Sequence, residues 1–217
     1  MYVLCACEES QEVCKAFRSQ GHTAFSCDIQ FCSGGHPEWH IMQDVLPLLD
    51  GCCSFTTCDG VIHSIPCKWD LLIAFPPCTY LTVAGNAWFD VVRYGDLALH
   101  RFKLRELAID FFMNFVNADC DKICIENPVG IMSSFYRSPD QIIQPYFFGD
   151  PYSKRTCLWL KGLQPLTATN YCHDYHRHWV ESCFYLPDDE RQRVRSKTFP
   201  GVAAAMAEQF PFTYTLI

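Results

Sequence analysis

The sequence predicts an α/β fold with a doubly wound, mostly parallel sheet. Strand-like and helix-like segments alternate along the chain, and the strand-like runs are apolar throughout, as in sheets that are buried on both faces. The clearest run, residues 69–75, is followed by Pro76 and Pro77, and because neither proline can donate to a strand ladder, the strand must end there. Cys78 therefore begins a stiff loop at the carboxyl end of a central strand, where open α/β sheets bind ligands.

Four segments are expected before that strand, in the order strand, helix, strand and loop: residues 3–7, 11–20, 23–27 and 30–60. The helix has apolar residues at helical spacing, and Gly21 follows it in the position that often ends a helix. The second strand ends at Asp28. Glycines interrupt the fourth segment, which is why we expect it to be rich in loops.

Four further segments are expected after Cys78: a helix at 97–116, strands at 123–125 and 156–160, and a helix at 200–210. The first helix is amphipathic, and its predicted apolar stripe consists of Leu97, Leu104, Leu107, Ala108, Phe111, Phe112 and Phe115. We expect a single domain over residues 1–217, with a loop-rich excursion at about 161–195.

Composition limits the classes of function. The chain has 217 residues, of which 49% are hydrophobic, so it is long enough for one compact domain with a substantial core. Its net charge of −7 does not favour nucleic acid over the whole surface, so any such contact needs a locally basic face. The chain has no apolar stretch of about 18 residues and no signal peptide, which predicts a cytoplasmic protein without a membrane span. We expect most of the 15 cysteines to be reduced and buried.

Reactive or polar residues follow four predicted strands at their carboxyl ends: Cys7 to Gln11, Asp28, Pro76 to Cys78, and Glu126 to Pro128. Taken singly, each group is a common turn signal. Because the carboxyl ends of parallel strands meet at one edge of a sheet, the ordered set predicts a crevice shared by a thiol and a carboxylate. A thiol held rigidly at that edge is placed for nucleophilic catalysis.

The ordered set resembles the motifs of the DNA cytosine-5 methyltransferase family, and the likeness is closest to the short versions encoded by phages and prophages. Phe75-Pro76-Pro77-Cys78 resembles the nucleophile motif of that family, and Glu126-Asn127-Pro128 resembles its Glu-Asn-Val motif. Four other segments resemble its remaining motifs: Asp28, Asp44-Val45, Gly149 to Arg155, and Arg195 to Ala207. The likeness spans nearly the whole chain and implies a Rossmann-like class I methyltransferase fold.

The resemblance implies methyl transfer from S-adenosylmethionine to C5 of cytosine in DNA. Cys78 would add to C6 as a thiolate, and Glu126 would hold the base at N3 and at the exocyclic amine while the adduct forms. Lys154 or Arg155 would bind the base carbonyl or orient Glu126, and the register of this motif leaves both open. Loss of the C5 proton would then expel the thiolate.

The resemblance also implies a site for the methyl donor, built from Cys7, Glu8, Glu9, Ser10, Asp28, Ile29, Asp44, Val45, Phe75, Pro76 and Thr198. Asp28 corresponds to the acid that binds the donor ribose, and Asp44 to the acid beside the adenine. The first turn departs from the family pattern, because the family has glycines there and Cys7 to Gln11 contains none. A residue with a Cβ resists positive φ and close approach, so either the donor binds in a modified turn or the site is lost.

A second departure is size, because the family carries a large target-recognition region where this chain has only residues 161–195. That segment offers possible backbone contacts, although a solvated loop is the simpler interpretation: His173, His176, Arg177, His178, Arg191, Arg193 and Arg195. A second basic set is interpreted as the polar face of the long helix: Arg93, Arg101, Lys103 and Arg105. The short segment leaves open a free cytosine nucleotide or a single strand as substrate, and a protein partner that supplies sequence recognition.

Other functions are weighed on particular residues. An amino-methyltransferase also uses a Pro-Pro turn, but Phe75 before the prolines and Cys78 after them argue against that class. A catalytically degenerate protein that binds the donor or nucleic acid is the remaining alternative, and the glutamate-rich first turn favours it. No metal site is predicted, because two loose groups lack paired Cys-x2-Cys spacing: Cys172, His173, His176, His178 and Cys183, and Cys52, Cys53, Cys58, His63 and Cys67.

Overall fold

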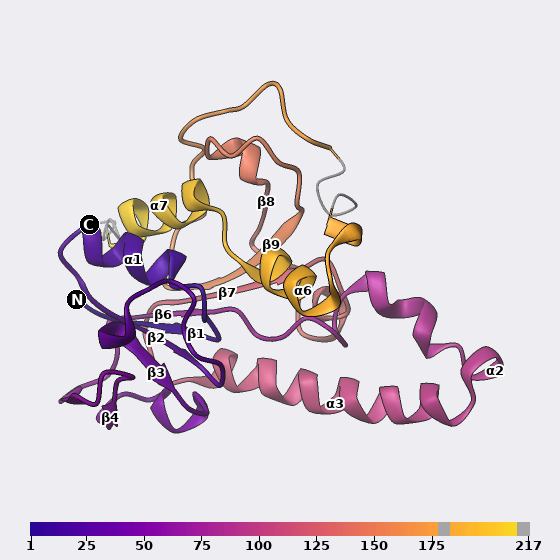
Figure 1. Cartoon of the computed structure of the whole chain (residues 1–217), viewed down its shortest axis with the longest axis horizontal. Coiled ribbons are helices and arrows are strands. Elements are labelled where there is room, and N and C mark those ends of the chain that lie inside the picture. The colour runs from indigo at the N-terminus through magenta and orange to yellow at the C-terminus, as the bar shows by residue number, and fades with distance from the viewer. Residues whose placement is uncertain (178–182, 212–217) are drawn as a thin grey trace.

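The computed structural model describes residues 1–177 and 183–211 and shows an α/β fold built on a seven-stranded mixed sheet (Figure 1). The strand order is β3-β2-β1-β6-β7-β9-β8. The strands are β1 (Tyr2–Ala6), β2 (Thr23–Asp28), β3 (His40–Met42), β6 (Leu71–Ala74), β7 (Ile123–Pro128), β8 (Gln141–Ile143) and β9 (Thr156–Lys161). The first five are parallel, whereas β9 runs antiparallel to both β7 and β8. The predicted α/β class with a mostly parallel sheet is confirmed.

The described helices are α1 (Glu12–Ser19), α2 (Val91–Tyr94), α3 (Asp96–Asn117), α4 (Met132–Phe135), α6 (Asp188–Ser196) and α7 (Pro200–Gln209). Short 3-10 turns are η1 (Pro37–Trp39), η2 (Leu46–Leu48), η3 (Val83–Phe89), η4 (Pro145–Phe147) and η5 (Cys183–Tyr185). A separate antiparallel hairpin consists of β4 (Ser54–Thr56) and β5 (Ile62–Ser64).

Helices cover both faces of the sheet: α1 and α7 lie on one face and α3 on the other (Figure 1). Successive strand residues point to opposite faces, so in β1 Cys5 packs with the α1–α7 layer and Leu4 with the α3 layer. Phe17 and Met206 fill the first layer and Phe112 fills the second, each with no exposed surface. Burial on both faces explains why the strands are apolar throughout.

The strand before the double proline lies where the sequence predicts it. All four residues of β6 are buried, and β6 pairs in parallel with β1 on one side and β7 on the other. The strand order reverses between β1 and β6, which is the switch point at which α/β sheets bind ligands beyond the carboxyl ends of their strands. The turns after β1 and β6 therefore border the same edge.

Several strands differ from the prediction. β7 continues to Pro128 because β9 pairs with it along its full length, so Glu126 and Asn127 lie within a strand and not after one. β3 and β8 lie outside the predicted strands, and β3 and β4 interrupt the segment at 30–60 that we expected to be loop. Strands of three residues are too short for a periodic pattern, and only pairing with a neighbour defines them.

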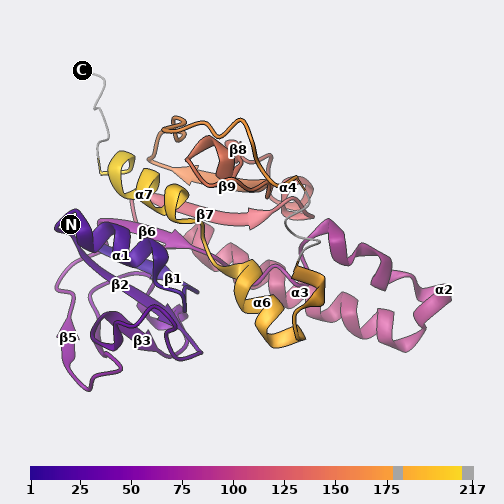
Figure 2. The same cartoon turned by 45° about the horizontal axis from the view of Figure 1, so that its top comes forward.

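The predicted apolar stripe of α3 is partly wrong. Leu97 is 74% exposed and Leu107 is 63% exposed. The first half of α3 extends with α2 away from the sheet (Figures 1 and 2), so apolar side chains there meet no strand layer. The residues that α3 does bury are Ala98, Ile109, Phe112 and Phe115.

The segment at about 161–195 is largely irregular in its described part, with η5 and α6 as its regular elements. Residues 178–182 lie outside the described residues, and His178 with them. The sequence patterns did not predict α6, whose last turn carries Arg193 and Arg195. In Figure 1 α6 lies over the middle of the molecule, close to the end of β7.

Two expectations from composition can be compared with the structure. The cysteines all lie in the described part of the chain and are all unpaired, and eight of the 15 are buried. Among the described residues, no helix combines the length and the apolar character needed to cross a membrane.

Candidate functional site

The loop that carries Cys78 is fixed through its backbone. Pro76, two residues after the end of β6, is buried, and the side chain of Cys78 is half-buried. The carbonyl oxygen of Cys78 accepts hydrogen bonds from the backbone N–H groups of Leu81 and Thr82, both at 3.0 Å. Cys78 thus begins a closed, hydrogen-bonded turn. The two prolines before it restrict the backbone further.

Three charged groups act on the thiol of Cys78. Burial is the largest cause and raises the pKa of the thiol, and the carboxyl group of Glu126 raises it further. Lys154 and Arg195 oppose that rise. The structure therefore brings together Cys78, Glu126 and Lys154, which come from three separate segments of the chain.

Asn127 connects the two motifs directly. Its side-chain Nδ2 donates a hydrogen bond of 2.7 Å to the carbonyl oxygen of Pro76, and the residue is 2% exposed. Its Oδ1 is buried and accepts no hydrogen bond within the described part of the chain. The bond fixes the turn after β6 against β7, and with it the distance between Cys78 and Glu126.

Glu126 is an acid whose surroundings favour its neutral form. Burial raises the pKa of Glu126, and only the charge of Lys154 and a hydrogen bond with Thr156 oppose this rise. A protonated carboxyl can donate a hydrogen bond, which a carboxylate cannot. The position therefore suits a group that donates a proton toward a ring nitrogen.

Lys154 and Arg155, which the sequence left as alternatives, lie in different surroundings. Lys154 is half-buried, its Nζ donates to the carbonyl oxygen of Arg195 at 2.8 Å, and its charge acts on Glu126. Arg155 is exposed, and its charge acts on Cys157. Lys154 is the one of the two that lies beside the acid.

A small cavity extends the site from Glu126 toward α7. It is lined by Glu126, Ile143, Pro145, Lys154, Thr156, Thr198, Phe199, Val202 and Met206. Cys78 is not part of this lining, so the cavity does not enclose the thiol. Of the residues predicted to bind the methyl donor, Thr198 faces this cavity.

The turn after β1 adopts glycine-like geometry without glycine. Cys7 has φ 58° and Gln11 has φ 60°, both in the left-handed region that side chains disfavour. The chain accepts this strain because Gln11 is held from both ends: its Nε2 donates to the carbonyl oxygen of His36 at 2.9 Å, and its Oε1 accepts from the N–H of His36 at 3.1 Å. The turn is thus modified relative to the family pattern and clamped by a neighbouring loop.

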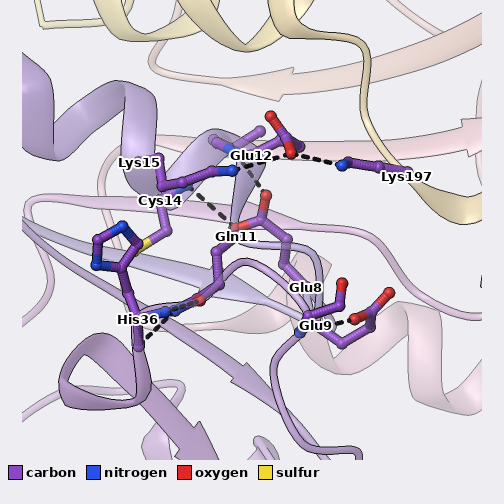
Figure 3. Close-up of polar contacts among 10 residues, drawn as sticks. Glu8, Glu9, Gln11, Glu12, Cys14, Lys15, His36 and Lys197 are labelled. Carbon is purple, nitrogen blue, oxygen red and sulfur yellow. Dashed lines mark hydrogen bonds and ion pairs between the residues drawn. The ribbon is translucent and has the colours of Figure 1, made fainter.

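Glu8 closes the amino end of α1, as Figure 3 shows. Its carboxyl oxygens accept hydrogen bonds from the N–H groups of Val13 at 2.6 Å and Cys14 at 3.1 Å, and the residue is 4% exposed. Burial raises the pKa of Glu8 to about 8, although both hydrogen bonds act in the opposite direction. The free N–H groups that begin a helix commonly bind anions, and here Glu8 already occupies two of them.

An ion pair joins α1 to the segment after α6. Glu12 lies 2.8 Å from the Nζ of Lys197 and 3.0 Å from that of Lys15 (Figure 3). These bonds lower the pKa of Glu12, in spite of burial, which acts against them. Lys154, just before β9, and Glu12 of α1 therefore hold the chain at the end of α6, the first through the carbonyl oxygen of Arg195 and the second through Lys197.

Acidic side chains gather beyond β1 and β2. Burial raises the pKa of Asp28, which accepts a hydrogen bond from the N–H of Gln30 at 3.0 Å, and the charge of Glu9 adds to that rise. After burial, the charges of Asp28 and Asp44 contribute to the raised pKa of Cys7. The structure thus brings four of the predicted donor-site residues together.

The remaining predicted donor-site residues differ in their accessibility. Ser10 is 4% exposed and Val45, also 4% exposed, packs in the core, so neither offers much surface to a ligand. Pro76 is buried and Phe75 is half-buried against the core. Ile29 is 78% exposed.

Asn127 and Arg195 were not among the site residues predicted from the sequence. Asn127 belongs to the Glu126-Asn127-Pro128 motif, and a side-chain amide next to a buried acid is a signal of a positioning role. Arg195 had no such signal, because its approach to Cys78 depends on how α6 folds over the sheet edge.

Within residues 1–177 and 183–211, no three His, Cys, Asp or Glu side chains lie close enough to hold a metal ion.

No protein-family model matches the chain, and no curated protein matches it.

Proposed function

We propose that this chain transfers a methyl group from S-adenosylmethionine to C5 of cytosine in DNA, through a transient bond between Cys78 and C6 of the base. The observation that carries the proposal is the bond from Asn127 to Pro76, which joins the candidate nucleophile turn to the strand of the candidate acid. The switch point between β1 and β6 supplies the edge at which such a site forms.

The first step in this mechanism is addition of Cys78 to the base. The thiol loses its proton to solvent, and the thiolate Sγ forms a bond to C6 as electrons move toward N3. Glu126, which burial favours in its neutral form, donates its proton toward N3 and so prevents charge from building on the ring. C5 then has the electron density of an enamine.

Lys154 and Arg195 support the addition through their charge. Both oppose the rise in the pKa of Cys78, so each increases the fraction of thiolate. After methylation at C5, N3 returns its proton to Glu126, and loss of the C5 proton to solvent re-forms the C5–C6 double bond as the bond from C6 to sulfur breaks. The leaving thiolate is stabilised by the same two cations.

The acidic edge beyond β1 and β2 fits a cationic methyl donor. One carboxyl oxygen of Glu9 is buried with no hydrogen-bond partner in the described chain, and Glu9 lies close enough to Asp28 to raise its pKa. Glu8 occupies two N–H groups at the start of α1, which disfavours a ligand phosphate there and so argues against a dinucleotide. When bound, S-adenosylmethionine supplies a methyl group that carbon nucleophiles attack.

A covalent-trapping experiment tests nucleophile and base together. Duplex DNA that contains 5-fluorocytosine is incubated with the protein and S-adenosylmethionine, and a complex that survives denaturation is sought on a gel. We expect a complex with the native protein and none with Cys78→Ser. Cys53→Ser, which alters another half-buried cysteine, should form the complex normally.

Absence of any complex with the native protein, together with absence of labelled methyl in DNA, would refute the proposed transfer. A complex that persists in Cys78→Ser would refute the role of Cys78. Donor binding without either product would instead indicate the degenerate binding protein that the sequence analysis kept as an alternative.

A second candidate substrate is a single strand or a free cytosine nucleotide. The observation that favours it is the short segment between β9 and α7, whose described part contains only η5 and α6 as regular elements. Labelled donor should be offered with duplex, single strand and dCMP in parallel. Methyl transfer to duplex alone would exclude this candidate.

A further inference from the structure

Two arginines of α3 hold the loop that follows Cys78. The Nη2 of Arg101 donates to the carbonyl oxygen of Thr79 at 3.2 Å. The Nε of Arg105 donates to the carbonyl oxygen of Tyr80 at 2.9 Å, and its Nη2 donates to Oδ1 of Asn86 at 2.9 Å. The two residues directly after the candidate nucleophile are therefore both bound through their backbone by guanidinium groups.

Aromatic rings complete this arrangement. The guanidinium carbon of Arg105 lies 3.4 Å from the ring centroid of Phe89, and that of Arg101 lies 4.9 Å from the ring of Tyr80. Burial and the neighbouring charge of Arg101 both lower the pKa of Arg105. The two like charges repel each other, so their placement costs stability that the bonds to the loop and the rings must offset.

The opposite side of the same loop rests on the segment after Glu126. The carbonyl oxygen of Leu81 accepts from the N–H of Ile131 at 2.8 Å, and Thr82 pairs with Gly130 in an isolated β-bridge. A Cβ at Gly130 would overlap the carbonyl group of Leu81, so this close approach requires glycine. The loop therefore lies between a rigid backbone contact and the two arginines.

We propose that Arg101 and Arg105 are positioning residues that keep the sulfur of Cys78 in place opposite Glu126. The proposal rests on the proposed function. Arg101 and Arg105 do not act on the thiol through their charge, since the charges that act on Cys78 are those of Glu126, Lys154 and Arg195. Their effect comes from hydrogen bonds to the loop, and the two bonds that the guanidinium of Arg105 donates at once cannot be reproduced by a lysine, whose ammonium is a point charge.

The test compares Arg105→Lys and the double variant Arg101→Ala/Arg105→Ala with Lys103→Ala. Lys103 is exposed on the same helix, and its removal deletes a positive charge without touching the loop. Alkylation of Cys78 by iodoacetamide is followed against pH, with peptide mass spectrometry to separate it from the other cysteines. Thermal unfolding of each variant is measured alongside.

Release of the loop should expose Cys78, so its apparent pKa should move down toward the usual thiol value in Arg105→Lys and in the double variant. The kcat for methyl transfer should fall by about 10- to 100-fold while KM for DNA stays unchanged, as expected for a misplaced reacting group. Lys103→Ala should match the native protein in both measurements.

The proposal is overturned if folded Arg105→Lys has the alkylation profile and the kcat of the native protein. If the double alanine variant loses activity that Arg105→Lys fully retains, charge alone matters. Arg105→Lys keeps the test valid if the double variant does not fold. If the native protein transfers no methyl group, the proposed function fails, while the alkylation profile still decides whether the arginines position Cys78.

Discussion

The side-chain amide of Asn127 donates a hydrogen bond of 2.7 Å to the main-chain carbonyl oxygen of Pro76. Pro76 follows one strand of the switch point and Asn127 lies in the neighbouring strand, so a single buried bond ties the turn of Cys78 to the strand of Glu126. The geometry of the candidate site depends on this bond more than on either motif alone.

Asn127→Asp should break this link with almost no change in volume. A carboxylate cannot donate to the Pro76 oxygen, and it places two buried acceptors against each other, at a cost of about 2 kcal/mol or more. We expect urea unfolding to shift accordingly and trapping of 5-fluorocytosine to fall. Asn114→Asp is the matched control, because Asn114 also donates to a backbone oxygen but is exposed on α3. Equal effects from the two substitutions would contradict the prediction.

Lys154→Met and Arg155→Met should separate the two cations that the sequence left open. Loss of Lys154 removes a charge that lowers the pKa of the Cys78 thiol, so the fraction of thiolate falls and we expect trapping to slow by about 100-fold. Arg155→Met should have little effect, because that side chain is exposed. Trapping rates of the two variants give the answer, and the reverse order would show that Arg155 serves the site.

Arg195→Ala should raise the pKa of the Cys78 thiol, since Arg195 is one of the two cations that lower it. The measurement is the pH dependence of alkylation at Cys78, whose midpoint should move to higher pH. Arg193→Ala removes the same charge from the same helix end, where the side chain is exposed. A similar shift from Arg193→Ala would mean that net charge is responsible and not the position of Arg195.

Glu8→Gln should remove a pH dependence from the stability of the fold. Burial raises the pKa of Glu8 from 4.5 to about 8, so its stabilising contribution is complete below about pH 4.5 and is lost as pH rises through about 8. Relative to the variant, the free energy of unfolding of the native protein should fall over that window, by at most about 5 kcal/mol. Urea unfolding at several pH values measures this difference.

The control for Glu8 is Glu208→Gln, which changes an exposed acid of α7. Its curve should run parallel to that of the native protein. If Glu8→Gln also ran parallel, the carboxyl of Glu8 would titrate normally and its role at the start of α1 would need another account.

Gly130→Ala should force apart the loop that carries Cys78 and the segment that follows β7, the strand of Glu126. The new Cβ would overlap the backbone of Leu81, which cannot rotate away as a side chain can, so we expect a loss of about 1–3 kcal/mol and of trapping. Gly60→Ala separates this effect from backbone strain, because Gly60 has φ +87° but open space around it. Gly60→Ala should lower stability and leave trapping intact; retained trapping in Gly130→Ala would contradict the argument.

Much of the central sheet was predictable from sequence because its strands are apolar on both faces. The run before Pro76 and the run before Glu126 each had to be buried, and the prolines defined where the first of them ends. Short strands such as β3 and β8 were not predictable, since three residues carry no period and depend on a partner strand.

The two halves of α3 show where a local pattern stops being informative. Leu97 and Phe112 belong to the same predicted stripe, but only Phe112 is buried, because the sheet does not reach as far as the first turns of the helix. Periodicity shows which side of a helix is apolar, whereas the extent of the neighbouring layer determines how much of that side is covered.

By itself the sequence determined the α/β class, the central strands and the placement of Cys78 after the carboxyl end of β6, because burial and proline chemistry act locally along the chain. Only the tertiary structure decided that Lys154 and not Arg155 lies beside Glu126, and that Arg195 approaches Cys78. It also decided that α3 holds the loop after Cys78. The physical reason is that these contacts join segments far apart in the chain, and their partners are set by strand order and helix packing.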